Sequence, residues 1–241
     1  MTASPSVRAA LRERGPSGIN HRLARGRRTA KLLAERLLPE SLVVWRGSEA
    51  RRVTRQSGRV ALSFDDGPTP LTLRYLDVLE QLGVRATFFL VGELCAAHPE
   101  WVRAIVESGH EVAGHGYTHR RFTTFSRAEL TSELLRTSAL LPVRDGKRQL
   151  VRPPYGAVSA SSLLTCALQG FTTVLWSLNS GDWRARDAQE VERTVSTTRA
   201  SAGEIVLLHE GQPLTIEALP GVVGSLKESG HELATVGELL A

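Results

Sequence analysis

Cysteine is scarce in this 241-residue sequence, which has only Cys95 and Cys166. Two cysteines exclude a disulfide framework, and the chain has neither a CxxC motif nor a cysteine-rich metal site. Long apolar runs are missing as well, since no 18 consecutive residues are apolar, which argues against a membrane-spanning helix. Aromatic residues make up only 5% of the chain, too few to map stacking surfaces from sequence alone.

The rest of the composition, 41% hydrophobic and 23% charged, is typical of a globular protein. The charge, however, is unevenly distributed. Residues 1–59 contain 14 Lys and Arg against 4 Asp and Glu, whereas residues 60–241 carry a net charge of −5. Such a basic segment can contact nucleic acid, anionic lipid or an acidic polymer, but the simpler interpretation is a solvated Arg-rich extension. We expect no nucleic-acid partner.

The N-terminal quarter has one apolar stretch, at 32–45. Glu35, Arg36, Pro39 and Glu40 interrupt it, so it does not form the continuous apolar core of a signal peptide, and we expect a cytoplasmic protein. We interpret residues 1–58 as a basic, partly disordered extension. Within it the pattern predicts loop or disorder over 1–28, a helix over 29–38, a strand over 41–45 and a linker over 46–58.

From residue 59 onward, short apolar runs rich in β-forming residues alternate with helical patterns. The predicted strands lie at 59–64, 86–91, 111–113, 149–151, 172–177, 204–208 and 231–235. The predicted helices lie at 71–83, 99–108, 126–141, 159–169, 187–199, 215–228 and 236–240. Apolar runs without strict alternation suit parallel strands that are covered on both faces. Seven β-then-α units predict one α/β domain over 59–241, with fewer units than a full eight-stranded barrel.

Polar, reactive residues follow five of these strands. They are DDGP at 65–68, GHGYTH at 114–119, RPPYG at 152–156, NSGDW at 179–183 and His209. Because the carboxyl ends of parallel strands share one face, we expect these segments to meet at one mouth.

A metal site is the first chemistry that these residues suggest. His115 and His119 are four residues apart, and with one carboxylate they make a two-His, one-Asp set with open positions for water and substrate. Alone, such a histidine pair is a weak signal, and two adjacent aspartates before Gly-Pro can simply form a turn. The pair Asp65 and Asp66 offers one carboxylate to a metal and one as a base. His209 follows an apolar run and is a candidate acid, although a buried structural histidine is the alternative.

Five segments together resemble a known family. SFDDGP at 63–68, HGYTH at 115–119, RPPYG at 152–156, SGDW at 180–183 and LLH at 207–209 are similar, in order and spacing, to the five motifs of the polysaccharide deacetylases (NodB homology domain, carbohydrate esterase family 4). The resemblance spans about residues 59 to 215. It implies a deformed, incomplete (β/α)7-type barrel, in agreement with the seven units counted above.

The resemblance also implies which groups transfer protons. Asp65 would be the general base, oriented by Arg152. His209 would be the general acid, and Asp182 would adjust its acidity.

It implies the ligands and the pocket walls as well. One divalent ion, with zinc expected and cobalt or nickel also compatible, would be held by Asp66, His115 and His119. The backbone N–H of Tyr155 would donate a hydrogen bond to the oxyanion. Trp183 and Leu207 would line the pocket for the acetyl methyl group.

The implied reaction is hydrolysis of N-acetyl groups on a glycan that contains N-acetylglucosamine, with release of acetate. Chitooligosaccharide, peptidoglycan and exopolysaccharide all remain open as substrates. Alternatives are a non-catalytic carbohydrate- or polyanion-binding protein with a relic barrel, or a deacylase of a small non-sugar amide. Two histidines with one carboxylate also occur in non-haem iron oxygenases, but the parallel α/β pattern and the acid and base candidates argue against these. The oligomeric state is not predicted.

Three positions depart from the family's pattern. Gly116 replaces a usual Ser or Thr, Asn179 a frequent Asp, and Glu210 a common Asp. None of them removes an implied ligand or proton-transfer group, but each affects the loops that set sugar specificity.

Overall fold

The structure is a computed structural model that describes residues 43–44, 58–143, 146–198 and 200–241. The expectations for 1–28, 29–38 and the linker up to residue 57 lie outside these described residues. The described part of the chain contains a parallel sheet of nine strands. Their order in the sheet is β1 (Val43–Val44), β6 (Phe171–Val174), β5 (Gln149–Val151), β4 (Glu111–Gly114), β3 (Thr87–Leu90), β2 (Gly58–Gly67), β8 (Ile205–His209) and β7 (Leu178–Asn179), and β9 (His231–Ala234) pairs with β2.

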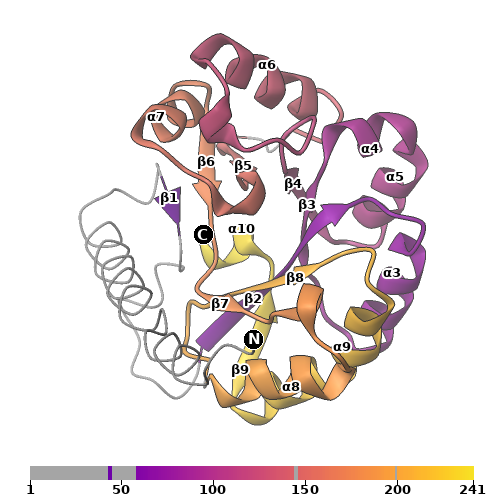
Figure 1. Cartoon of the computed structure of the whole chain (residues 1–241). Helices are drawn as coiled ribbons and strands as arrows, with labels where there is room; N and C mark the ends of the chain where they lie inside the picture. Colours follow the sequence, from indigo (N-terminus) through magenta and orange to yellow (C-terminus); the bar gives the residue numbers. More distant parts are fainter. Residues whose placement is uncertain (1–42, 45–57, 144–145, 199) are drawn as a thin grey trace, which may run out of the picture. The chain divides into compact units, whose positions relative to one another are not determined.

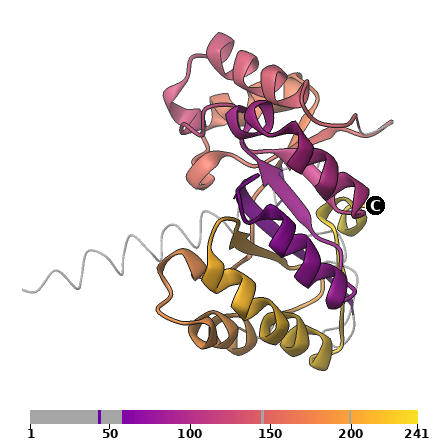
Figure 2. The same ribbon diagram turned by 90° about the vertical axis from the view of Figure 1, so that its right-hand side faces the viewer.

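Helices surround this curled sheet on its outside (Figures 1 and 2). They are α3 (Thr72–Gln81), α4 (Gly92–Ala97), α5 (Pro99–Glu107), α6 (Arg127–Ser138), α7 (Ala160–Leu168), α8 (Ala188–Thr197) and α9 (Pro213–Glu228). The last helix, α10 (Val236–Leu239), lies within the curl in Figure 1, and its residues Val236 and Leu239 share a core cluster with residues of the strands. Three short 3-10 turns complete the described elements: η2 (Phe122–Thr124), η3 (Pro154–Gly156) and η4 (Asp182–Arg184). Among the described strands, β1 and β7 end the sheet order and do not pair with each other, so the barrel is open. The predicted incomplete (β/α) barrel is therefore confirmed.

Strand β2 organises the sheet because it is long enough to pair with three neighbours. Its first part, Gly58 to Ala61, pairs with β9, and Ala61 to Asp65 pairs with β8. Its last part, from Ser63 to Gly67, pairs with β3. The apolar run of this strand is buried throughout, as the sequence pattern predicts for a parallel strand covered on both faces.

Two expected elements differ from the structure. The predicted strand over 172–177 ends at Val174, and the chain resumes pairing only at Leu178, as the separate strand β7. Helix α4 was not predicted, because its six residues are too few to show a helical period. The expected domain boundary between residues 58 and 59 remains a prediction, although β1 pairs with β6 and so belongs to the sheet.

Within the described residues, no helix combines the length and the apolar character needed to cross a membrane.

The largest core cluster lies between the sheet and α3, α5, α8 and α9. The fully buried rings of Phe64 and Phe88 stack with their centroids 5.0 Å apart, and Tyr75 packs edge-on against Phe64 at 5.4 Å. Aromatic pairs of this kind stabilise a core beyond the area that they bury.

We predict that Phe88→Ala lowers the free energy of unfolding by about 3–5 kcal/mol, because it leaves a cavity beside Phe64 and removes a ring stack. Urea denaturation measures this change. Leu164→Ala is the matched control, because Leu164 is 55% exposed on α7 and its removal should change stability by roughly 0.5 kcal/mol or less. Similar losses in the two variants would contradict this description of the core.

Candidate functional site

A pocket of about 450 Å³ opens at the carboxyl ends of the strands. It is lined by Asp65, Asp66, His115, His119, Tyr155, Trp176, Asn179, Trp183, Leu207 and His209. The structure thus brings eight of the ten sequence-predicted site residues to one cavity. The other two, Arg152 and Asp182, are buried and bonded to Asp65 and His209 respectively.

An irregular backbone lets two adjacent aspartates serve the same pocket. Successive side chains of a regular strand point to opposite faces. Here the register with β3 shifts between Asp65 and Gly67, and Asp66 has a left-handed φ of 73°. Among the described residues, the other non-glycine positive φ values are 55° at His119 and 60° at Tyr155, both in this pocket. Such conformations cost about 1–3 kcal/mol each and concentrate at functional sites.

Three side chains at the base of the pocket form a compact donor set. Asp66 Oδ1 lies 3.4 Å from His115 Nε2 and 3.0 Å from His119 Nε2, and one donor atom from each residue lies within 4.8 Å of the others. The backbone carbonyl of Arg152 accepts a hydrogen bond from His115 Nδ1 at 2.8 Å, which leaves the Nε2 lone pair facing Asp66. One carboxylate and two imidazoles are ligands that zinc and similar divalent ions accept, so these residues fit a metal.

The electrostatics of Asp66 agree with this arrangement. Burial alone would raise the pKa of its carboxyl group, but His115 and His119, when protonated on the nitrogens that face it, donate hydrogen bonds to it and hold its pKa well below the usual range. The carboxylate is thus the favoured form at the position where a cation would bind.

Asp65 is held by an arginine that is entirely buried. The Arg152 guanidinium donates to Asp65 Oδ1 at 2.6 Å and to Ser63 Oγ at 2.9 Å. It also donates to the carbonyl oxygens of Val174 and Leu175 at 3.4 and 3.1 Å. Burial lowers the pKa of Arg152, and the charge of Asp65 opposes that effect. Arg152 forms its hydrogen bond with Oδ1 of Asp65. The other carboxylate oxygen, Oδ2, lies on the side of His115, 3.7 Å from His115 Nε2.

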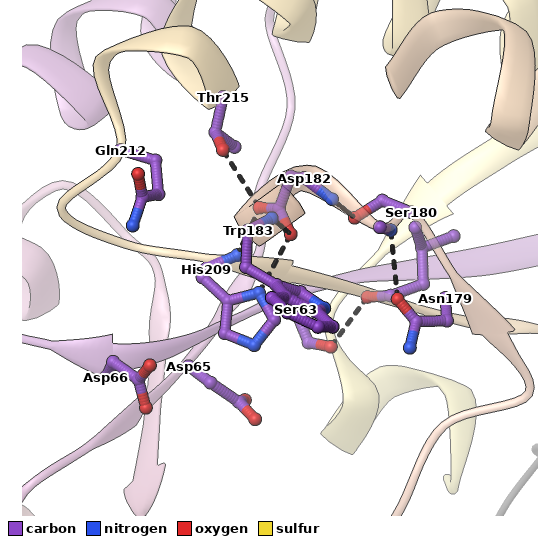
Figure 3. Close-up of polar contacts among 12 residues, drawn as sticks. Ser63, Asp65, Asp66, Asn179, Ser180, Asp182, Trp183, His209, Gln212 and Thr215 are labelled. Atoms are coloured by element: carbon purple, nitrogen blue, oxygen red, sulfur yellow. Dashed lines mark hydrogen bonds and ion pairs between the residues drawn. The ribbon is translucent and has the colours of Figure 1, made fainter. Parts of the chain in front are cut away.

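On the other side of the pocket, Asp182 binds His209 (Figure 3). Asp182 Oδ1 accepts from His209 Nδ1 at 2.8 Å and from the Trp183 backbone at 2.9 Å. Asp182 Oδ2 accepts from the His209 backbone at 2.7 Å and from the Thr215 hydroxyl at 2.8 Å. Burial lowers the pKa of His209, but the bond to Asp182 and the charges of Asp182, Asp65 and Asp66 outweigh it and raise the pKa above 6.5. Burial likewise raises the pKa of Asp182, but its bond to His209 brings the net value below 3.8.

The predicted substrate-binding residues form the walls. Tyr155 and Trp183 are 59% and 58% exposed, whereas Leu207 is buried. The Tyr155 hydroxyl lies 3.4 Å from His119 Nδ1. Trp176 also lines the pocket and was not predicted, because it lies inside the apolar run that was assigned to a strand.

Glu133 on α6 is a second residue that sequence reasoning missed. Its buried carboxylate accepts from the backbone N–H groups of Tyr117 and Thr118, at 2.9 and 3.0 Å, in the loop between the two site histidines. In the sequence it resembles any glutamate of an amphipathic helix, so no local signal identified it. At Gly116 in the same loop φ is +78°, and an added Cβ would lie 3.1 Å from the ring of Phe122. The loop that lacks the family's usual hydroxyl is thus braced by Glu133.

Glu210 fixes the loop on the other side of the aspartates. Its Oε1 accepts from the Thr69 backbone at 3.0 Å and from the hydroxyls of Thr69 and Thr72. Its buried Oε2 has no hydrogen-bond partner and faces Gly67, where a Cβ would come within 1.9 Å. Burial raises the pKa of this carboxyl group. A side chain at position 67 would therefore require Glu210 to move.

Comparison with known proteins supports the resemblance. A family model described as polysaccharide deacetylase matches residues 52–174. The peptidoglycan-N-acetylglucosamine deacetylase of Listeria monocytogenes is 33% identical over 87% of this chain, and the match spans only 44% of that longer relative. The chitooligosaccharide deacetylase of a Bradyrhizobium strain is 37% identical over 75% of this chain and 90% of its own length. A crystal structure of a peptidoglycan N-acetylglucosamine deacetylase superposes with a TM-score of 0.74 at 28% identity, covering 83% of this chain and 92% of the other. These matches confirm the resemblance that the five motifs indicated.

We predict that Glu133→Ala weakens binding of zinc by about 10–100-fold, the usual range for the loss of a group that orients metal ligands. The variant leaves two N–H groups unpaired and frees the loop between His115 and His119. Glu133→Gln retains an acceptor oxygen for these groups and should lose much less. Chelator competition measures the zinc affinity, and circular dichroism checks folding. Unchanged affinity in Glu133→Ala would refute the bracing role.

We further predict that His209 titrates above pH 6.5 in NMR spectra and that Asp182→Asn brings this pKa below 6.5, because it removes the facing negative charge while burial remains. Thr215→Val keeps that charge, so the pKa should stay raised. Because the folded-state pKa is raised, the interaction contributes stability below about pH 6.5 and loses it as the pH rises through the folded-state value. A wild-type pKa at or below 6.5 would contradict the ion pair.

Proposed function

Because the chain belongs to the polysaccharide deacetylase family, we propose that it removes N-acetyl groups from glycans that contain N-acetylglucosamine, in a metal-dependent hydrolysis that releases acetate. The observation that carries this proposal is the pairing within the pocket, where Asp65 with Arg152 and His209 with Asp182 flank the donor set of Asp66, His115 and His119. The names of the matched relatives, which refer to peptidoglycan N-acetylglucosamine and to chitooligosaccharide, favour the same class of substrate.

Asp66, His115 and His119 would hold the divalent ion, for which zinc is the first candidate and cobalt or nickel are compatible. Such an ion, when bound, supplies polarisation of the acetyl carbonyl and a lower pKa of bound water. Asp65 accepts the proton of the attacking water through Oδ2, since its Oδ1 is engaged by Arg152. The Tyr155 backbone N–H donates to the oxyanion as charge develops there.

His209 completes the reaction. In its protonated form it donates from Nε2 to the nitrogen of the departing sugar, while Nδ1–H remains bound to Asp182. The C–N bond then breaks to give acetate and a free amine. Trp183 and Leu207 exclude water around the acetyl methyl group. The cytoplasmic location expected from the sequence remains a prediction.

Two other functions would use the same pocket: binding of a glycan without catalysis, and deacylation of a small non-sugar amide. Acetate release distinguishes them from the proposed function. We expect the protein to release acetate from N-acetylglucosamine pentamers, to lose this activity with a chelator and to regain it with zinc. A protein that binds the pentamer but releases no acetate would be a non-catalytic binder, and activity on small amides alone would favour the deacylase.

Two variants test the division of roles. Asp65→Asn should lower kcat roughly 10²–10⁴-fold with zinc affinity retained, because the general base is gone and the ligands are intact. His209→Ala should lose a similar factor on the amide, and this loss should shrink on an activated acetyl ester, whose leaving group needs little protonation. An His209→Ala enzyme with near wild-type turnover of the amide would require a different acid.

A further inference from the structure

The turn η3 holds two consecutive residues in an unfavourable backbone conformation. Tyr155 and Gly156 both have a left-handed φ of 60°. A residue with a bulky side chain keeps this conformation only where the surrounding structure holds it. The next two N–H groups are bonded within the turn, Gly156 to the Pro153 carbonyl at 3.0 Å and Ala157 to the Pro154 carbonyl at 3.2 Å. The direction of the Tyr155 N–H therefore depends on what holds this turn in place.

The indole ring of Trp176 lies against the turn. A Cβ added to Gly156 would lie 2.7 Å from Cη2 of this ring, 3.2 Å from Cζ3 and 3.6 Å from Cζ2. The space beside the Gly156 backbone is thus filled by the outer edge of the indole. Trp176 also lines the pocket, so the same ring faces both the turn and the site.

Trp176 is itself held by its neighbours in the chain. The carbonyl of Leu175 accepts from the Arg152 guanidinium at 3.1 Å, and the N–H of Ser177 donates to the Ile205 carbonyl at 3.1 Å. The indole packs against the core cluster that contains Ile205, and its centroid lies 5.8 Å from Arg152 Cζ. The ring is therefore a fixed surface against which the turn can rest.

We propose that Trp176 is a positioning residue for the oxyanion donor. Its indole keeps the η3 turn left-handed and so aims the Tyr155 N–H at the place where the oxyanion forms. This inference rests on the proposed function, in which that N–H donates to the oxyanion. Arg152 then has one more role, because the guanidinium that holds Asp65 also fixes Leu175, the residue before Trp176.

The variant Trp176→Leu leaves a gap beside Gly156. It should lower kcat for acetate release from the N-acetylglucosamine pentamer by roughly 10–100-fold, since a displaced oxyanion donor loses part of its effect. KM and zinc affinity should change little, because neither depends on the Tyr155 N–H. Trp101→Leu on α5 is the matched control; Trp101 does not line this pocket, and its variant should keep the wild-type kcat. A raised KM with unchanged kcat in Trp176→Leu would mean that the indole binds the sugar, and would overturn the proposal.

A tetrahedral inhibitor separates the oxyanion from ground-state binding. In a methylphosphonamidate analogue of the pentamer, a charged phosphoryl oxygen takes the place of the oxyanion. Its Ki should rise in Trp176→Leu by the same factor by which kcat/KM falls, because both depend on the Tyr155 N–H. Trp176→Phe keeps a smaller ring and should recover part of the loss. A wild-type Ki in Trp176→Leu would contradict the positioning role.

The variant Gly156→Ala tests the same contact from the other side. In the wild-type protein the added methyl group meets the indole, so the turn or the ring must shift and kcat should fall. The strain of alanine at this φ is present in any background, but in Trp176→Leu the methyl group has more room. The loss caused by Gly156→Ala should therefore be smaller in Trp176→Leu than in the wild type. Losses that simply multiply would show that the two positions do not act on each other.

Failure of the proposed function gives a different result, because the wild-type protein itself would then release no acetate from the pentamer. Amide hydrogen exchange tests the turn without turnover. The N–H groups of Gly156 and Ala157 should exchange roughly 10-fold faster in Trp176→Leu than in the wild type or Trp101→Leu, relative to the amides of β8. Equal exchange in the three proteins would refute the support of the turn by Trp176.

Discussion

Arg152 has no solvent exposure, and its guanidinium donates to acceptors that come from separate parts of the sheet. It fixes Asp65 at the end of β2 and caps the carbonyl groups of Val174 and Leu175, where β6 ends. Its own backbone carbonyl orients His115. One residue thus positions the candidate base and one candidate metal ligand together. Burying an unpaired guanidinium would be very costly, so the positions of these acceptors and of the arginine depend on one another.

Two aromatic rings also contact the Arg152 guanidinium. Its Cζ atom lies 3.9 Å from the centroid of Phe89 and 5.8 Å from that of Trp176. Trp176 in turn packs against Gly156, where an added Cβ would lie 2.7 Å from the indole. Trp176, which follows the end of β6, is therefore both a lining residue of the pocket and a neighbour of the Arg152 guanidinium.

The sequence allowed the strands and their common face to be predicted, because buried parallel strands leave apolar runs and the reactive residues follow directly after them. It did not reveal Glu133, Thr215 or Ser63. Each of these is an ordinary polar residue in its own segment and acquires its role only from a partner far along the chain. Local pattern also gave no indication of how adjacent aspartates reach one pocket. That depends on the left-handed Asp66 and on the register shift between Asp65 and Gly67.

The two proton-transfer candidates, Asp65 and His209, contact charged groups of opposite sign, and this difference favours different roles for them. Asp65 is backed by a guanidinium, a group that only donates hydrogen bonds and does not exchange its proton at ordinary pH. Of these two groups, only the Asp65 carboxylate can therefore accept a proton. His209 is backed by Asp182, which is saturated by four hydrogen bonds and has a pKa below its usual range. Asp182 thus stays an anion and keeps a proton on His209. A candidate acceptor held by a cation and a candidate donor held by an anion thus line one pocket, which is the arrangement that the proposed hydrolysis of an amide would use.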